Sequence, residues 1–352
     1  MTWRLTAAAH TDDWAGDWRR LHQRAGSPVL LDLDFILPLL HQFGSGDELL
    51  ASCEQQGVVV AMAVVTRHGR FAWATFQPAQ APVGLWLQAP ASALEPLLDS
   101  LLRALPGAAL TFGLTQCDPA LLARPPSGAR LDTFDYIDTA RITMQGDFDA
   151  FWAARGKNLR ANLKKQRARL DKEGVAVRLD VSRDAAAMAA AVADYGRLES
   201  AGWKARGGTA VHPDNDQGRF YRDMLEAMCR RGAGSVYRYW IGDRLAAMDL
   251  CVEDAGCVVV LKTSYDEQVA HGLSPALLMR EEACRALFDG ARLERIEFYG
   301  KVMEWHLRWT DEIRTMYHIN YYRWQALRRL HAWRRGRAVS GARPIESTTE
   351  QA

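Results

Sequence analysis

The sequence predicts an α/β (α+β) protein made of two similar units, each with a mixed, mostly antiparallel sheet flanked by helices. The length of 352 residues is enough for two domains, and 48% hydrophobic with 24% charged residues is typical of a globular chain. An internal repeat supports two copies, because Gly57 and Ala61 in one strand–turn–strand pattern match Gly242 and Ala246 in another. Chance similarity of two alternating hairpins is the alternative explanation.

The predicted boundaries follow from this repeat. We expect a first unit at 1–145, a second at 146–326, and a basic helix followed by a disordered polar tail at 327–352.

Composition excludes several classes of protein. A net charge of +2 gives no general attraction to nucleic acid or anionic membranes. The six cysteines show no CxxC or Cys/His ligand spacing, so we expect no metal site and no disulfide framework, but reduced thiols in a cytoplasm. There is no apolar run of membrane-spanning length and no signal-like start, so we expect neither export nor a membrane span.

The first half reads in order as strands and helices separated by turns. The predicted elements are a strand and helix within 1–26, strands within 49–65 and 69–76, a helix at 91–105, and strands at 109–114 and 135–143.

The second half begins with helices and ends in a strand–loop–helix–strand segment. Helices are predicted at 151–173, 184–199 and 220–231, and strands at 236–240, 245–252, 257–263 and 295–298. Between the last two strands a helix is expected at 274–289, because Ser274 suits the N-cap, Pro275 the first turn and Gly290 the C-terminus.

The start of this last helix is the candidate ligand site. Backbone N–H groups from Gly272 to Ala276 lie at a positive helix end just beyond a strand, where a phosphate or pyrophosphate can bind. An ordinary capped crossover helix is the alternative. The first half lacks the Ser-Pro start, since 77–83 is broken by prolines, so only the second half is expected to keep a complete cofactor site.

The sequence LKTSYDEQVAHGLSPALLM, with its basic strand end and Ser-Pro helix start, resembles the acyl-CoA-binding segment of GNAT acyltransferases. With ESAGWK, GGTA and EFYG it resembles the BioF2-like branch, which is associated with cellulose and polysaccharide biosynthesis and related to Fem peptidyltransferases. The resemblance covers about 148–324 and implies tandem GNAT-like domains, the first of them degenerate. Ala276 stands where the family commonly has glycine. The cofactor-binding residues implied are Lys262, Thr263, Ala270, His271, Gly272, Leu273, Ser274, Pro275 and Ala276.

The sequence indicates the residues that bind the acyl acceptor less clearly than those that bind the cofactor. Within the basic helix at 151–173, Arg160 is a candidate to attract an anionic acceptor, and a solvated helix face or tRNA binding are the alternatives. The resemblance implies that Trp203 and Lys204, near Glu199, shape the acceptor pocket, whereas a core tryptophan beside a surface ion pair is the structural alternative. Trp305 is a candidate aromatic wall of the pocket.

Acyl transfer from a thioester to an amine needs a base, a donor to the carbonyl and an acid for the thiolate. Glu199 and Asp249 are the candidate bases, and Tyr265 and Tyr299 the candidate acids. Counting back from the turn at Asp254 places Asp249 opposite Lys262, as a structural ion pair or as a base in a wet cleft. Backbone N–H groups at the end of the 257–263 strand could polarise the carbonyl.

The sequence therefore predicts an acetyl-CoA- or acyl-CoA-dependent N-acyltransferase acting on an amine, or a hydroxyl, of a polysaccharide or cell-envelope precursor. The alternatives are a Fem-type aminoacyl-tRNA-dependent peptidyltransferase and a non-catalytic accessory protein of a polysaccharide biosynthesis system.

Overall fold

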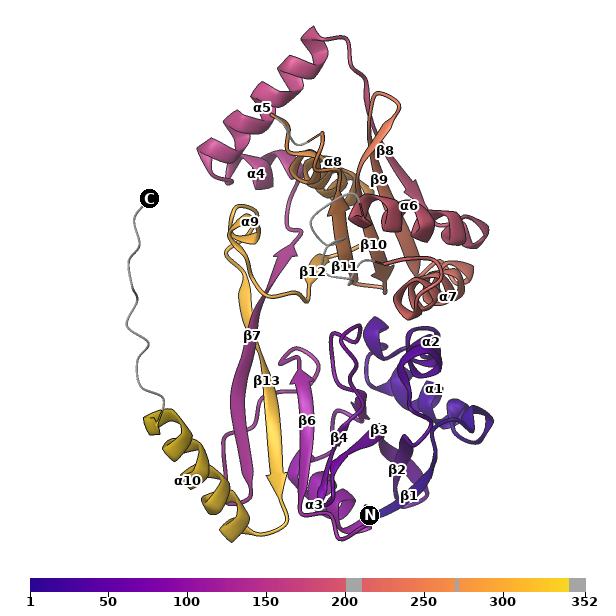
Figure 1. The fold of residues 1–352 in the computed structure, drawn as a ribbon, viewed down its shortest axis with the longest axis vertical. Coiled ribbons are helices and arrows are strands. Elements are labelled where there is room, and N and C mark those ends of the chain that lie inside the picture. The colour runs from indigo at the N-terminus through magenta and orange to yellow at the C-terminus, as the bar shows by residue number, and fades with distance from the viewer. Residues whose placement is uncertain (201–210, 270–271, 342–352) are drawn as a thin grey trace.

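The structure is a computed structural model, which describes residues 1–200, 211–269 and 272–341 (Figure 1). The described strands join in one sheet, in the order β1-β2-β3-β4-β6-β13-β7-β12-β11-β10-β9-β8, with β5 attached to β3. The predicted α/β class with helices on mixed sheets is confirmed.

The N-terminal half contributes the following elements: β1 (Thr2–Ala7), α1 (Ala15–Arg24), α2 (Leu33–Phe43), β2 (Leu49–Gln55), β3 (Val58–Gly69), β4 (Ala72–Thr75), β5 (Trp86–Gln88), α3 (Leu94–Ala104), β6 (Thr111–Cys117) and β7 (Leu131–Thr143).

The C-terminal half begins with α4 (Phe148–Ala153), α5 (Lys157–Lys172), β8 (Val177–Ser182), α6 (Met188–Ser200) and α7 (Asp216–Arg230). It continues with β9 (Gly234–Ile241), β10 (Arg244–Glu253), β11 (Cys257–Tyr265), α8 (Pro275–Gly290), β12 (Arg295–Phe298), α9 (Glu304–Leu307), β13 (Ile313–Tyr322) and α10 (Gln325–Gly341).

The two halves repeat one arrangement of strands. In the first, β2, β3 and β4 form an antiparallel meander, and β6 returns parallel to β4 after α3. In the second, β9, β10 and β11 form the meander, and β12 returns parallel to β11 after α8. The turns at Gly57 and Gly242 both need a positive φ, 76° and 58°, which favours glycine. The internal repeat in the sequence therefore corresponds to a repeated fold unit.

The last strand of the chain returns to the centre of the sheet. β13 lies between β6 and β7 and is antiparallel to both. Figure 1 shows β7 and β13 running together from one half to the other, with α10 beside them. Residues 313–322 thus complete the N-terminal sheet as well as the C-terminal one, which joins the two halves through backbone hydrogen bonds.

A shared core joins the halves on one face of the sheet. Phe35 and Phe43 of α2 each lie 5.6 Å, between ring centroids, from Phe220 of α7. The opposite face carries two separate cores, one under α3 and one under α8. Because the helices of both halves pack together, a ligand site in one half is held in place partly by the other.

Local details differ from the sequence predictions. The basic helix predicted at 151–173 is two helices, α4 and α5, because the chain turns at Gly156, the N-cap of α5. All six cysteines lie in the described residues as buried free thiols. No described helix combines the length and apolar character needed to cross a membrane. No cluster of three or more potential metal ligands occurs in the described ranges.

Candidate functional site

A wedge opens in the sheet between β11 and β12. The two strands pair only from Cys257 opposite Arg295 to Val260 opposite Phe298, while β11 continues to Tyr265 along β10. At this point β11 also bulges, since Val260 lies opposite Cys251 and Lys262 opposite Leu250. Leu261 is therefore the extra residue. Beyond the bulge, no strand of the described residues pairs with β11 on its β12 side, so this backbone edge is available to a ligand.

The bulge changes which face of the sheet each side chain reaches. Val258 and Val260 pack in the core under α8, whereas Lys262 approaches the ring of Tyr221 on the α7 side, 5.6 Å from its centroid. Asp249 consequently lies opposite Thr263. The predicted Asp249–Lys262 pair is wrong, because the extra residue at Leu261 shifts the register by one and reverses the direction of every later side chain.

A cleft of about 740 Å³ follows the wedge, with the start of α8 and the segment after β12 in its walls. Its polar and aromatic lining includes Tyr195, Lys262, Thr263, Tyr265, Ser274, Arg280, Lys301, Trp305, His306 and Arg308. Four of its described lining residues are basic and none is acidic. The cleft is therefore suited to an anionic ligand.

The N-terminus of α8 is capped by another helix. The backbone N–H of Ser274 donates to Oε1 of Gln166 at 2.7 Å, and Nε2 of Gln166 donates to the Ser274 hydroxyl at 3.2 Å. Ser274 occupies the N-cap position as predicted, but its side chain makes no capping hydrogen bond. Pro275 has no N–H, and no partner of the Ala276 amide is found among the described residues. This amide points to an anion site at the helix start.

Most of the predicted cofactor residues meet in this cleft. Its lining includes six of them, namely Lys262, Thr263, Leu273, Ser274, Pro275 and Ala276. Gly272 comes directly before Leu273 and has a φ of +94°. A β-carbon at this position would lie 2.8 Å from Nη1 of Arg169. Ala270 and His271 lie outside the described residues.

Residues 157–307 match the family described as acetyltransferase (GNAT) domain. This range begins at α5, ends at α9 and contains the bulge, the wedge and the start of α8. This segment is therefore similar to GNAT acetyltransferase domains.

The whole chain resembles solved structures in fold. One is the C-terminal domain (DUF2156) of a protein named as a lysylphosphatidylglycerol synthetase from Agrobacterium fabrum, with a TM-score of 0.53, 15% identity, and coverage of 91% of this chain and 95% of that one. Another is a conserved protein of unknown function from Bacteroides thetaiotaomicron, with a TM-score of 0.54, 8% identity, and coverage of 83% and 90%. No curated protein matches in sequence. At these identities the likeness concerns the fold alone.

In the segment that matches the family, Asp249 is enclosed by polar partners. Its Oδ2 lies 2.7 Å from Nη2 of Arg280, and its Oδ1 accepts a hydrogen bond of 2.5 Å from the Thr263 hydroxyl. Burial raises the pKa of Asp249, while the charge of Arg280 and these hydrogen bonds act to lower it. Arg280 lines the cleft and Asp249 lies behind it.

Glu199 is the second buried carboxylate near the cleft. Its Oε2 accepts the backbone N–H of Val211 at 2.7 Å, and its Oε1 lies 3.6 Å from Nζ of Lys262. Sequence reasoning placed Lys204 beside Glu199, but Trp203 and Lys204 lie outside the described residues. The long-range partner Lys262 carried no signal in the sequence, because it depends on the bulge.

The phenols differ in their access to the cleft. Tyr265 lines it and is 43% exposed. Tyr299 is directed to the other half of the protein, where its hydroxyl donates to Asp118 at 2.7 Å, and burial with the nearby Asp118 raises its pKa. Tyr195 of α6, which sequence reasoning did not select, is a fully buried lining residue.

The two remaining predicted residues, Trp305 and Arg160, lie in different parts of the structure. Trp305 lines the cleft and stacks on His306, whose Nδ1 accepts the backbone N–H of Met303 at 3.0 Å. Burial lowers the pKa of His306 to about 4, so this ring is a neutral imidazole with its proton on Nε2. Arg160 lies elsewhere, in a shallow groove of about 590 Å³ along α5 that also contains Lys157 and Lys164.

The corresponding wedge of the N-terminal half is closed. Beyond the pairing of Ala74 with Gly113, the hydroxyls of Thr75 and Thr115 are joined by a hydrogen bond of 2.8 Å. The N–H of Gly84 then donates to the carbonyl of Thr115 at 3.1 Å. The segment before β5 therefore occupies the space that is open in the C-terminal half.

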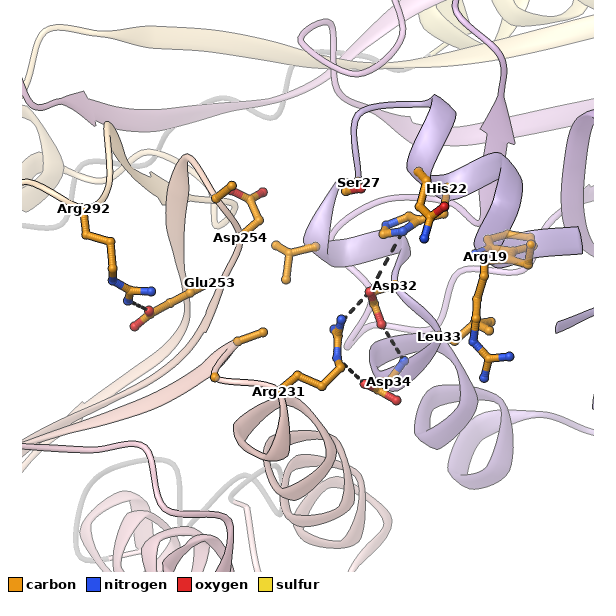
Figure 2. A pocket seen from close by; sticks show the side chains of 16 residues that line it. Arg19, His22, Ser27, Asp32, Leu33, Asp34, Arg231, Glu253, Asp254 and Arg292 are labelled. Carbon is orange, nitrogen blue, oxygen red and sulfur yellow. Dashed lines mark hydrogen bonds and ion pairs between the residues drawn. The ribbon is translucent and has the colours of Figure 1, made fainter. Parts of the chain in front are cut away.

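A second cavity, of about 550 Å³, lies between the two halves (Figure 2). Arg231, the residue that follows α7, projects across it and binds Asp32 at 3.0 Å and Asp34 at 2.5 Å, while Arg292 pairs with Glu253 on the opposite wall. Arg231 of the C-terminal half is paired with two aspartates of the N-terminal half, Asp32 and Asp34. These ion pairs across the cavity link the two halves.

Proposed function

We propose that the protein transfers an acyl group, acetyl in the simplest case, from acyl-CoA to an amine or hydroxyl of a polysaccharide or cell-envelope precursor. The observation that carries this proposal is one continuous basic cleft that connects the start of α8 with the bulge at Leu261.

The cleft accounts for each part of an acyl-CoA. The pyrophosphate would bind at the start of α8, where Ala276 offers an amide and the guanidinium of Arg169 lies beside Gly272. The pantetheine arm would follow the unpaired edge of β11 through the wedge. Backbone N–H groups at the bulge would donate to the thioester carbonyl as negative charge develops on its oxygen.

Proton transfer is assigned to the groups that the cleft can reach. Glu199 is the preferred base, because its partner Lys262 lines the cleft, whereas Asp249 is enclosed by Arg280 and Thr263. A water molecule would carry the proton, since Glu199 itself is not a lining residue. Tyr265 is preferred over Tyr299 as the acid for the thiolate, because the Tyr299 hydroxyl already donates to Asp118.

Calorimetric titration of the purified protein with acetyl-CoA, longer acyl-CoAs and free CoA tests the donor class. We expect saturable binding at one site, with free CoA retaining much of the affinity through its phosphates. Absence of binding at millimolar ligand would exclude the acyl-CoA donor and favour the non-catalytic accessory protein or the tRNA-dependent enzyme.

A Fem-type aminoacyl-tRNA-dependent transferase is the second candidate function. The observation in its favour is the groove of α5, where Lys157, Arg160 and Lys164 form a basic surface outside the cleft. This function predicts tRNA binding that weakens steeply with salt, and a salt slope that is reduced by about 1 in Arg160→Ala. Salt-independent or absent tRNA binding in a filter or mobility assay would exclude it.

A further inference from the structure

The hydroxyl of Tyr195 is a buried polar group without a hydrogen-bond partner in the described part of the chain. The side chain is 0% exposed, and its oxygen has no hydrogen-bond partner among the described residues. Burying a hydroxyl without a hydrogen bond is unfavourable, so such groups are rare in folded proteins unless a ligand or water completes them. Because Tyr195 also lines the cleft, the group that completes it is expected to enter through the cleft.

The position of Tyr195 separates it from the phosphate end of the cleft. Tyr195 belongs to α6 and packs in the core shared by α6 and α7, on the opposite face of the sheet from α8. Lys262 reaches the same face because of the bulge at Leu261. A ligand that begins at the start of α8 and passes through the wedge therefore meets Tyr195 and Lys262 last. In the proposed reaction this is the side of the acyl acceptor.

Both groups can donate hydrogen bonds to an oxygen atom of a ligand. Burial and the neighbouring Glu199 raise the pKa of the Tyr195 phenol well above its usual range, which keeps its proton in place and makes it a poor acid for a thiolate. A lysine ammonium has no acceptor atom. Glu199 lies 3.6 Å from Lys262, and its negative charge repels a phosphate dianion more strongly than it repels a singly charged carboxylate.

We propose that Tyr195 and Lys262 form an acceptor subsite that binds a carboxylate of the acyl acceptor, so that the acceptor is an amino acid or carries a carboxylate near its amine. This inference rests on the proposed acyl-CoA-dependent function. It names the class of acceptor and adds Tyr195 as a residue that contacts it.

The test uses a product analogue and its uncharged match. The full-length protein, saturated with CoA, is titrated calorimetrically with N-acetylglycine and separately with N-acetylglycinamide, in which the carboxylate is replaced by an amide. We expect N-acetylglycine to bind and the amide to bind at least about tenfold more weakly. Two results would overturn the proposal. One is no detectable binding of N-acetylglycine up to about 50 mM, a concentration well above millimolar dissociation constants. The other is equal affinity for the two probes.

Tyr195→Phe isolates the hydroxyl. We expect it to weaken N-acetylglycine about tenfold, to leave CoA affinity unchanged, and to leave thermal stability unchanged or raised, because the hydroxyl has no protein partner to lose. The matched control is Tyr239→Phe, whose hydroxyl donates to Glu282 at 3.1 Å and does not line the cleft. The control should lose stability and keep both affinities.

The outcomes distinguish this inference from the proposed function. Binding of CoA together with unchanged N-acetylglycine affinity in Tyr195→Phe overturns the subsite and leaves the acyl-CoA donor in place. Reduced stability of Tyr195→Phe with unchanged affinity also overturns it, because that result assigns the hydroxyl a structural water. Failure of CoA to bind overturns the proposed function and the inference that rests on it.

Discussion

Asp249 of β10 and Arg280 of α8 form an ion pair of 2.7 Å in which the two side chains are only 1% and 4% exposed. The pair fastens α8 to the sheet directly behind the cleft, since Arg280 is a lining residue. A buried pair of this kind adds little net stability compared with an apolar pair, but the loss of one partner leaves an uncompensated charge.

Asp249→Ala is therefore expected to lower the free energy of unfolding by about 3–5 kcal/mol, because Arg280 remains buried without its counter-ion. The double variant Asp249→Leu with Arg280→Met should recover much of this loss. Urea denaturation of the two variants and the wild type checks the difference. If Asp249→Ala keeps wild-type stability and loses only turnover, Asp249 is the base and the structural role assigned to it is wrong.

Gly272→Asp is expected to abolish CoA binding by placing a carboxylate at the pyrophosphate site. The control is Gly272→Asn, which has the same size, meets the same Arg169 side chain and tolerates the same positive φ of +94° nearly as well. Asn should weaken CoA only mildly, so the difference between the variants measures charge alone. Equal calorimetric affinities for CoA would exclude this placement of the phosphates.

Gln166 is expected to matter more than Ser274 for the start of α8. Gln166→Leu leaves the Ser274 N–H without its acceptor in a half-buried site and should cost about 1–3 kcal/mol of stability. Ser274→Ala removes only the hydrogen bond of 3.2 Å to Gln166 and should cost less than about 1 kcal/mol. Chemical denaturation of both variants shows which of the two loses more stability. The reverse order would show that Ser274 caps the helix through its own side chain.

His306 makes stability depend on pH. In the folded protein burial lowers its pKa to about 4 from the ordinary value of 6.5, which the unfolded chain retains. The unfolded chain thus binds more protons between these values, and the stabilising contribution is complete above pH 6.5 and is lost as pH falls through about 4. The loss is up to about 3 kcal/mol.

The variant His306→Asn checks this assignment, since asparagine keeps an acceptor for the Met303 N–H and does not titrate. Its free energy of unfolding should fall less than that of the wild type between pH 6.5 and 4. Identical pH profiles for the two proteins would mean that another group causes the dependence.

Much of the candidate site follows from short stretches of sequence. The predicted strand at 257–263, helix at 274–289 and strand at 295–298 correspond to β11, α8 and β12. Apolar runs, a Ser-Pro start and a glycine at the end depend only on neighbouring residues, so they can be read without the fold. The register of β10 and β11 was also correct from the turn up to Cys251 opposite Val260.

The rest depended on tertiary packing. One extra residue at Leu261 moved Lys262 from Asp249 to Glu199 and turned it toward the acceptor side. No sequence pattern marks such a bulge, because it is set by the departure of β12 and the packing on both faces.

The sequence by itself determined the order of β11, α8 and β12, the Ser-Pro start of α8 and the repeat of Gly57 and Gly242, since these arise from local propensity and periodicity. Only the tertiary structure decided that β13 lies between β6 and β7, that the first wedge is closed, and which residues face the cleft. These features join residues far apart in the chain, and their free energies come from pairing and burial that exist only when the whole sheet is formed.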